Sequence, residues 1–239
     1  DRLADAMQAF SLLMKINQVE NYRACATSAM RESTNGQEVA DEVYKRTGVR
    51  IEIIDGAEEA SIIASTDISS LIQKDKDYLY IDVGGGSTEF TVFSKGKVKK
   101  SRSFPIGTVR LLDNKVSNKT WEDVEKWIKK HTKDCEHIEA IGSGGNINKI
   151  HKNSNSKEGE PLSYQYLTDY HNYVSGFSYE ERIRLLGFNP DRADVILYAL
   201  TVFTNAMKWS GAEIVHVPRI GLADGIVRTI YNKENNVIK

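Results

Sequence analysis

The stretch Leu79-Tyr80-Ile81-Asp82-Val83-Gly84-Gly85-Gly86-Ser87-Thr88-Glu89-Phe90 joins two apolar segments through a run of three glycines. Glycine has no Cβ, so consecutive backbone N–H groups can turn toward one point and form a concavity that binds anions. The hydroxyls of Ser87 and Thr88 can donate to phosphate oxygens beside those amides. The stretch therefore predicts two strands of an α/β domain joined by a phosphate-binding turn, with Gly84, Gly85, Gly86 and Ser87 as ligands.

A plain glycine-rich hairpin turn is the alternative interpretation of this stretch. A tight hairpin needs one or two glycines, and it does not need an aspartate and hydroxyls around them. Asp82 cannot bind the same anion directly, so we expect it to hold a divalent cation or a bridging water. The spacing differs from that of a nucleotide P-loop, and a strand follows where the P-loop and the dinucleotide fingerprint require a helix.

Helices and strands alternate on both sides of this stretch. We expect helices over residues 2–17, 36–47, 58–71, 108–114, 120–135 and 222–231, and strands over 22–26, 51–54, 78–83, 88–93, 98–104, 138–141 and 214–217. Periodicity places Leu3, Met7, Phe10 and Met14 on one face of the first helix. Another helix should begin at Asn189-Pro190-Asp191, with Val195, Ala199, Val202, Phe203 and Ala206 facing the core.

Polar residues 74–77 read as a linker between two domains. We expect residues 1–76 to form the C-terminal part of a first α/β domain. Residues 77–239 should form a second α/β domain, with the last helix packing back on the first. The chain begins with Asp1 inside a helical pattern, so we also expect residues upstream of it.

Two further residues could take part in phosphoryl chemistry. Glu58 and Glu59 follow the strand at 51–54, where α/β proteins place ligands, and a carboxylate there can orient or deprotonate water. Acidic residues that favour a helix N-terminus are the alternative. Arg31 follows the strand at 22–26, and its guanidinium could bind phosphate oxygens in a bidentate manner, or it could be an ordinary surface residue.

Two other glycine-rich segments stand where a strand or loop gives way to a helix. Residues 142–146 read Gly-Ser-Gly-Gly-Asn, and the amides at this helix start predict a second anion site at Gly144 and Gly145. A close strand–helix packing turn is the alternative. Residues 221–225 allow the same two interpretations, and there we favour packing.

Composition narrows the class of protein. The 239 residues include 32 basic and 33 acidic side chains, a formal net charge of −1 that argues against nucleic acid or a membrane surface as partner. No apolar run approaches the length of a membrane span. Cys25 and Cys135 form no disulfide framework, and the five histidines have no metal-ligand spacing. We expect a cytoplasmic protein with reduced thiols, and a homodimer remains an alternative to a monomer.

Five segments in this order resemble the exopolyphosphatase / guanosine pentaphosphate phosphohydrolase (Ppx/GppA) family. They are Ala26-Thr27-Ser28-Ala29-Met30-Arg31-Glu32, residues 51–60, residues 81–89, residues 141–145 and residues 187–194. The resemblance covers nearly the whole chain. It implies the two-domain fold of actin, Hsp70 and the sugar kinases, here with an incomplete first domain. The chain is similar to the short members, and it lacks the family's first phosphate loop, an Asp-x-Gly-Ser-Asn hairpin.

The resemblance also implies roles for particular residues. Glu59 matches the catalytic glutamate that acts on the attacking water, and Arg31 matches an arginine that contacts phosphate. Residues 82–87 match the second phosphate loop, with Asp82 near magnesium and Glu89 as a further metal candidate. In residues 221–225 the chain has Leu222-Ala223 where the family commonly has Arg-Glu, so no role is carried over to those two positions.

These interpretations together predict a Mg²⁺-dependent hydrolase of acid anhydrides, an exopolyphosphatase or guanosine pentaphosphate phosphatase. It would release orthophosphate from the terminal phosphoanhydride of inorganic polyphosphate or of guanosine pentaphosphate, and the residues do not choose between the two. The alternatives are a non-catalytic protein that binds alarmones or polyphosphate, and an ATP-dependent kinase of the same fold.

Overall fold

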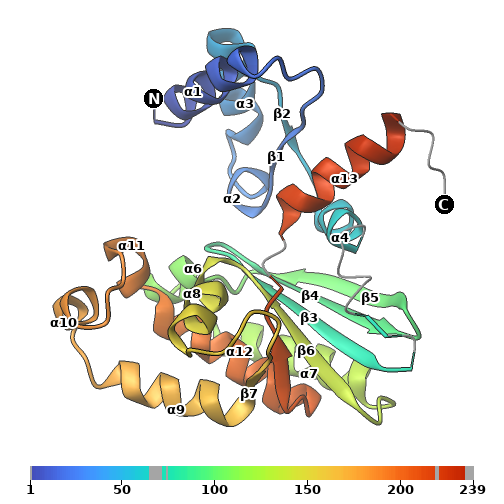
Figure 1. Ribbon diagram of the computed structural model, residues 1–239, viewed down its shortest axis with the longest axis vertical. Helices are drawn as coiled ribbons and strands as arrows, with labels where there is room; N and C mark the ends of the chain where they lie inside the picture. The colour runs from blue at the N-terminus through green and yellow to red at the C-terminus, as the bar shows by residue number, and fades with distance from the viewer. Residues whose placement is uncertain (1, 65–71, 74, 219–220, 235–239) are drawn as a thin grey trace. The chain divides into compact units, whose positions relative to one another are not determined.

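The computed structural model describes residues 2–64, 72–73, 75–218 and 221–234, and the chain forms two compact units (Figure 1). The first unit comprises Asp1–Thr66 and Leu222–Lys239, and the second comprises Asp67–Gly221. Residues 65–71 and 74 lie outside the described part of the chain. The expected domain boundary at residues 76 and 77 therefore stays a prediction, as does the end of the helix expected over residues 58–71.

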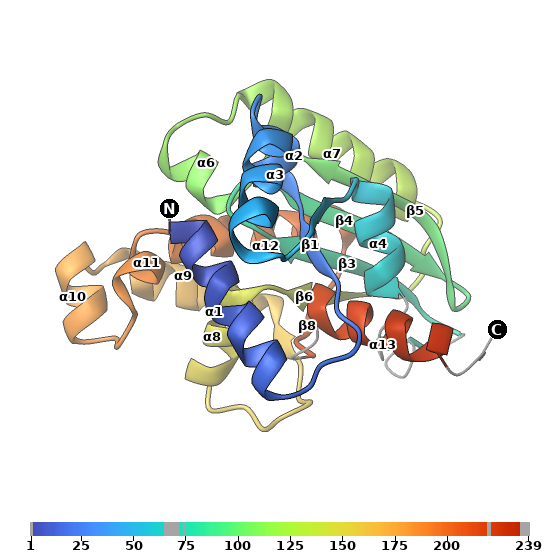
Figure 2. The same cartoon turned by 90° about the horizontal axis from the view of Figure 1, so that it is seen from above.

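The first unit contains a short parallel strand pair and its helices. Strand β1 (Ala24–Ala26) pairs with β2 (Ile51–Ile53), so that Cys25 lies opposite Glu52. The helices are α1 (Arg2–Ile16), α2 (Ser28–Arg31), α3 (Gly36–Thr47), α4 (Gly56–Ala64) and α13 (Leu222–Glu234). Helix α3 ends at Gly48, whose φ of 73° is the left-handed conformation that glycine adopts without strain. Helices α4 and α13 lie side by side in both views (Figures 1 and 2).

The apolar face expected for α1 is only partly correct. Ala4 is buried in a cluster with Ala40, Val43 and Ile51, and Met7 packs against the same cluster. Phe10, in contrast, is 56% exposed. Leu3 is 39% exposed as well, and Asp5 of α1 forms an ion pair with Arg46 of α3. The periodicity therefore predicted the helix correctly, but it did not predict which of its apolar residues are buried.

The second unit is built on a sheet of six strands among its described residues, in the order β5-β4-β3-β6-β8-β7. The strands are β3 (Asp77–Val83), β4 (Thr88–Ser94), β5 (Lys97–Phe104), β6 (Ile138–Ser143), β7 (Leu162–Ser163) and β8 (Ile214–His216). Strands β3, β4 and β5 are antiparallel neighbours, and β6 runs parallel to β3. Lys95 and Gly96, with φ of 51° and 75°, form the expected tight turn between β4 and β5.

One face of this sheet carries the main core. Leu79, Ile81 and Val83 alternate along β3 and pack with apolar residues of α7 (Asn118–Thr132) and α12 (Ile196–Ser210). Helix α9 (Tyr164–Ser175) packs against α12 on the side away from the sheet (Figure 1). Tyr80 and Asp82 project to the opposite face, because successive strand residues alternate. The remaining helices are α6 (Thr108–Leu112), α8 (Gly145–Asn153), α10 (Tyr179–Arg184) and α11 (Pro190–Ala193).

The helix expected from Asn189 onward is interrupted, which corrects the prediction. Helix α11 ends at Ala193, and α12 begins at Ile196. The carbonyl of Ala193 accepts a hydrogen bond from the guanidinium of Arg182 at 3.1 Å, so a side chain takes the place of the next helical amide. The core face of α12 is confirmed, since Val195, Ala199, Val202, Phe203 and Ala206 are all buried.

Candidate functional site

A row of four polar side chains crosses the sheet of the second unit. Asp82 of β3 lies opposite Glu89 of β4 and opposite Ser143 of β6, and Glu89 lies opposite Ser103 of β5. Directly opposite residues on neighbouring strands project to the same face. The Oε1 atom of Glu89 accepts hydrogen bonds from Ser87 Oγ at 2.6 Å and from Ser103 Oγ at 2.8 Å. The two serines therefore fix a carboxylate that is only 5% exposed.

The surroundings of Asp82 shift its pKa. Burial raises the pKa of Asp82 from 3.8 to about 6, and the negative charge of Glu89 adds to the rise. Hydrogen bonds from Tyr80 and Ser143 act in the opposite direction. A cation placed between the two carboxylates would relieve this repulsion. The pair is thus chemically suited to a divalent cation.

The glycine turn is held by its carbonyl groups. The amides of Thr108 and Val109, at the start of α6, donate to the carbonyls of Gly84 and Gly85, both at 2.9 Å. Arg110 Nε donates to the carbonyl of Gly86 at 2.7 Å. These contacts turn the three carbonyl groups toward α6, as a loop that binds anions through its amides requires.

Three of the four backbone N–H groups of this turn have no protein acceptor among the described residues. Gly84 N–H donates to the carbonyl of Ser87 at 3.0 Å, which closes the turn. Within the described part of the chain, the N–H groups of Gly85, Gly86 and Ser87 donate to no protein acceptor. Backbone amides in folded proteins are nearly always paired with protein, water or ligand. Three consecutive amides without a protein acceptor, next to a pair of carboxylates, are an arrangement that can bind an anion together with a cation.

Sequence reasoning missed two residues that position this turn. A Cβ added at Gly107 would lie 2.2 Å from the carbonyl oxygen of Gly85, so α6 can approach the turn only because residue 107 is glycine. Arg110 is the second, through its bond to Gly86. A glycine three residues before an arginine carries no local signal for either role, because the contact spans more than 20 residues of chain.

The second glycine-rich segment meets the first at the sheet edge. Strands β3 and β6 are parallel neighbours, so their following loops leave the same edge. Gly144 has φ of 106°, and a Cβ there would lie 3.0 Å from the carbonyl oxygen of Val83 and 3.4 Å from Asp82 Oδ1. The carbonyl of Gly145 accepts a hydrogen bond from Arg192. The anion-binding roles of Gly144 and Gly145 stay predictions.

Close packing explains other glycines of these segments. A Cβ at Gly142 would lie 3.1 Å from the side chains of Ile147, Phe203 and Val215, so this position is part of the strand–helix contact. In the third segment, Gly225 is buried and a Cβ there would lie 2.3 Å from the carbonyl oxygen of Ile62. The packing interpretation of residues 221–225 is thereby confirmed for Gly225.

The first unit brings Arg31 and Glu59 together. Arg31 follows β1 and Glu59 follows β2, and these parallel strands deliver both residues to one edge. The carboxylate of Glu59 is 7% exposed and lies 3.4 Å from a guanidinium nitrogen of Arg31. The same nitrogen donates to the carbonyl of Ile54 at 2.8 Å. A nearly buried carboxylate beside a partly open arginine is an arrangement that can bind phosphate and direct a water molecule.

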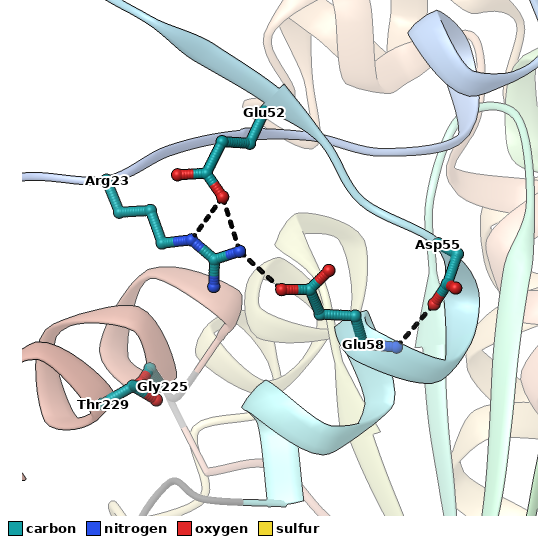
Figure 3. Close-up of polar contacts among 6 residues, drawn as sticks. All are labelled: Arg23, Glu52, Asp55, Glu58, Gly225 and Thr229. Carbon is teal, nitrogen blue, oxygen red and sulfur yellow. Dashed lines mark hydrogen bonds and ion pairs between the residues drawn. The ribbon is translucent and has the colours of Figure 1, made fainter.

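The neighbouring glutamate has a different environment. Glu58 is exposed, and its carboxylate forms an ion pair with Arg23, which also binds Glu52 through two nitrogens at 2.7 and 2.8 Å (Figure 3). The backbone N–H of Glu58 donates to Asp55 Oδ1 at 2.7 Å, so the Asp55 carboxylate caps the start of α4. Of the two adjacent glutamates, Glu58 is tied to the surface network, and Glu59 is turned toward Arg31.

Comparison with known proteins identifies the family. A sequence profile of the Ppx/GppA phosphatase family matches residues 1–234, and the chain belongs to this family. It is 28% identical over 235 residues to a bifunctional 3-dehydroquinate synthase/phosphatase of Fusobacterium nucleatum, covering 90% of this chain and 35% of the relative. It is 32% identical over 110 residues to a guanosine-5'-triphosphate,3'-diphosphate pyrophosphatase of Aeromonas hydrophila, covering 46% of this chain and 22% of the relative.

Solved structures confirm the predicted fold class. An exopolyphosphatase from Cytophaga hutchinsonii aligns with a TM-score of 0.83 at 23% identity, covering 98% of this chain and 82% of that one. An Aquifex aeolicus Ppx/GppA protein aligns with a TM-score of 0.75 at 22% identity, covering 98% of this chain and 81% of that one. The fold is therefore the mixed α/β fold of the Ppx/GppA proteins.

Proposed function

We propose that this chain supplies the phosphate-binding and water-activating residues of a phosphohydrolase that cleaves a terminal phosphoanhydride. The observation that carries the proposal is the glycine turn, whose three free amides stand beside the Asp82–Glu89 carboxylate pair. The family and the names of its relatives support a phosphatase. The chain spans about a third of the length of the Fusobacterium relative, so the activity of the whole protein is part of the proposal.

In this proposal different groups of the chain bind the phosphate and act on the attacking water. In the second unit, the amides of Gly85, Gly86 and Ser87 bind phosphate oxygens. In the first unit, Arg31 has the role of a phosphate-contacting arginine. Glu59 orients the attacking water and accepts its proton. The transition state of phosphoryl transfer is loose and mainly needs positioning and charge stabilisation, which amides and a guanidinium provide.

A magnesium ion is the proposed cofactor. Among the described residues no group of three or more histidine, cysteine, aspartate or glutamate side chains is arranged to hold a metal ion. Magnesium, however, is usually bound by one or two carboxylates together with substrate phosphates and waters. Asp82 and Glu89 fit that pattern. When bound, the ion would neutralise charge on the phosphate oxygens.

Inorganic polyphosphate and guanosine pentaphosphate are the two proposed substrates. Relatives named exopolyphosphatase and guanosine-5'-triphosphate,3'-diphosphate pyrophosphatase support one each. The described helices include none long and apolar enough to cross a membrane. We also propose a cytoplasmic location and a homodimer, which subcellular fractionation and light scattering would test.

The experiment compares Glu59→Gln with Glu58→Gln in the full-length protein, measuring Mg²⁺-dependent phosphate release from both substrates. Loss of the general base should lower the rate about a hundredfold or more in Glu59→Gln. Glu58→Gln is the matched control, since its carboxylate is bound by Arg23, and we expect a rate within about threefold of wild type. The substrate that is hydrolysed faster identifies the activity.

The alternatives give different results in the same assay. Tight binding of polyphosphate or guanosine pentaphosphate without phosphate release would indicate a binding protein. Transfer of the phosphate from ATP to an added acceptor, in place of water, would indicate a kinase. Equal rates in the two glutamine variants would remove Glu59 from the mechanism.

A further inference from the structure

A hollow in the second unit has no role in the proposed chemistry. It measures about 750 Å³ and lies between α6, α7, α12 and the turn that joins α6 to α7. This volume is in the range of small-molecule sites, about 300–1,000 Å³. The residues that line it are Leu111, Asn114, Val116, Asn118, Trp121, Glu122, Tyr198, Thr201, Asn205 and Trp209.

Two tryptophans form an aromatic corner in this hollow. The rings of Trp121 and Trp209 meet edge to face, with centroids 6.1 Å apart and planes at 66°. A planar ligand can stack on one ring while the other contacts its edge, and stacking of a nucleobase on an aromatic side chain is worth about 1–3 kcal/mol by alanine substitution. Tyr198 adds a third aromatic side chain to the wall.

Unused hydrogen-bonding groups surround this corner. Within the described part of the chain, the side chains of Asn114, Asn118, Asn205 and Tyr198 make no hydrogen bond to protein, nor do the indole N–H groups of the two tryptophans. Pockets that bind small molecules combine apolar walls with a few converging polar groups of this kind. Amide side chains offer a donor and an acceptor together, which matches the edge of a purine base.

Charge narrows the class of ligand. The residues found to line the hollow include Glu122 but no lysine or arginine, and the Glu122 carboxylate is paired with Lys126 Nζ at 3.5 Å. With this carboxylate paired, the lining offers no basic side chain to neutralise a phosphate group, so it favours an uncharged ligand. We propose that this hollow is a binding site for a planar, uncharged heteroaromatic ligand, of which purine nucleosides are the committed class.

The site is separate from the phosphate turn but shares an element with it. Leu111 of α6 lines the hollow, while Thr108, Val109 and Arg110 of the same helix bind the carbonyls of the glycine turn. Binding of a nucleoside in the hollow does not depend on whether the chain hydrolyses phosphoanhydrides, so the two proposals can fail independently.

Adenosine and guanosine are the probes, with ribose as the control ligand, titrated into the full chain. The chain has three tryptophans, and two of them line the hollow, so intrinsic fluorescence reports occupancy directly, with calorimetry as a second measurement. We expect saturable quenching by at least one purine nucleoside and none by ribose. Asn205→Leu should weaken binding about tenfold, and Asn172→Leu, the same change on an exposed part of α9, should not.

Asn118→Leu at the start of α7 gives the same readout from a second position if Asn205→Leu lowers the melting temperature of the protein. The absence of saturable binding by both nucleosides at concentrations up to about 1 mM would overturn the proposal. So would equal binding of ribose, or unchanged affinity in both asparagine variants of the hollow.

Discussion

Asp82 lies directly opposite Glu89 across the antiparallel strands β3 and β4, so that two carboxylates share one face of the sheet. Burial raises the pKa of Asp82 to about 6, and the like charge of Glu89 adds to the rise. Ser87 and Ser103 nevertheless hold Glu89 in place by hydrogen bonds. A divalent cation bound between the two carboxylates would convert the repulsion into attraction, which is the basis of the proposed cation site.

Replacing Glu89 by glutamine should weaken cation binding. The substitution keeps the size of the side chain but removes one of two negative charges. We expect the affinity for Mn²⁺, used as a spectroscopic substitute for Mg²⁺, to fall about tenfold or more. The control is Glu125→Gln on α7, which pairs with Lys129 at the surface. Equal Mn²⁺ affinities in the two variants would show that the carboxylate pair is not the cation site.

Gly107→Ala should displace the glycine turn from α6. The new Cβ would lie 2.2 Å from the carbonyl oxygen of Gly85, which is backbone and cannot move alone. Overpacking of this kind costs about 1–3 kcal/mol, and we expect weaker binding of inorganic phosphate, measured by calorimetry. Gly176→Ala is the control, since its Cβ would find an ordinary 3.4 Å contact. Phosphate affinity unchanged in Gly107→Ala would contradict the role given to α6.

Gly225→Ala should destabilise the first unit although it places alanine inside a helix. In an open helix this change would stabilise by about 1 kcal/mol. Here the new Cβ would lie 2.3 Å from the carbonyl oxygen of Ile62 on α4. Overpacking should therefore outweigh the gain in helix propensity and lower the unfolding free energy, at a cost of about 1–3 kcal/mol. Thermal unfolding followed by circular dichroism measures it, with Val227→Ala on the exposed side of α13 as control. A higher melting temperature for Gly225→Ala would refute the packing argument.

Glu139→Gln should lower stability in a pH-dependent way. Burial alone would raise the pKa of Glu139, but hydrogen bonds from Lys76 and His216 lower it below 4.5. The contribution of this carboxylate is therefore present above pH 4.5 and is lost as pH falls through the folded pKa. We expect the variant to lose on the order of 1 kcal/mol at neutral pH.

Urea unfolding at pH 7 and at pH 4 measures this difference. The difference in unfolding free energy between wild type and Glu139→Gln should be smaller at pH 4. This pH lies below 4.5, where protonation begins to remove the contribution of the wild-type charge. Glu136→Gln, an exposed neighbour, is the control. A gap of constant size across this pH range would mean that the network of Lys76, Glu139 and His216 does not act through charge.

Much of the fold could be predicted because its signals are local. The apolar alternation of residues 78–83 predicts a strand with two different faces, and Gly48 stops α3 by a conformation that depends on one residue. The break between α11 and α12 could not be predicted, because it arises where the side chain of Arg182 takes the carbonyl of Ala193. Val195 and Ala199 keep their helical spacing across the observed start of α12 at Ile196, so the apolar periodicity does not reveal the break.

The candidate site also combines residues that local sequence predicts with roles that depend on tertiary contacts. Glu58 and Glu59 are identical in chemistry and adjacent in sequence, and no local rule distinguishes them. Arg23 binds one and Arg31 faces the other, because parallel pairing of β1 and β2 brings residues about 30 positions apart to the same edge. The roles implied by the family resemblance are predictions that the variants above can test.

The sequence by itself predicted most of the helices and strands, the glycine turn after β3 and the resemblance to the family to which the chain belongs. These depend on side-chain periodicity and on the conformational freedom of glycine, which act over a few residues. Only the tertiary structure decided that α6 and Arg110 hold the turn, that Glu89 faces Asp82, and that Trp121 and Trp209 enclose a hollow with unused polar groups. Each of these relationships joins residues that are separated in the chain, and only packing and strand register bring them together.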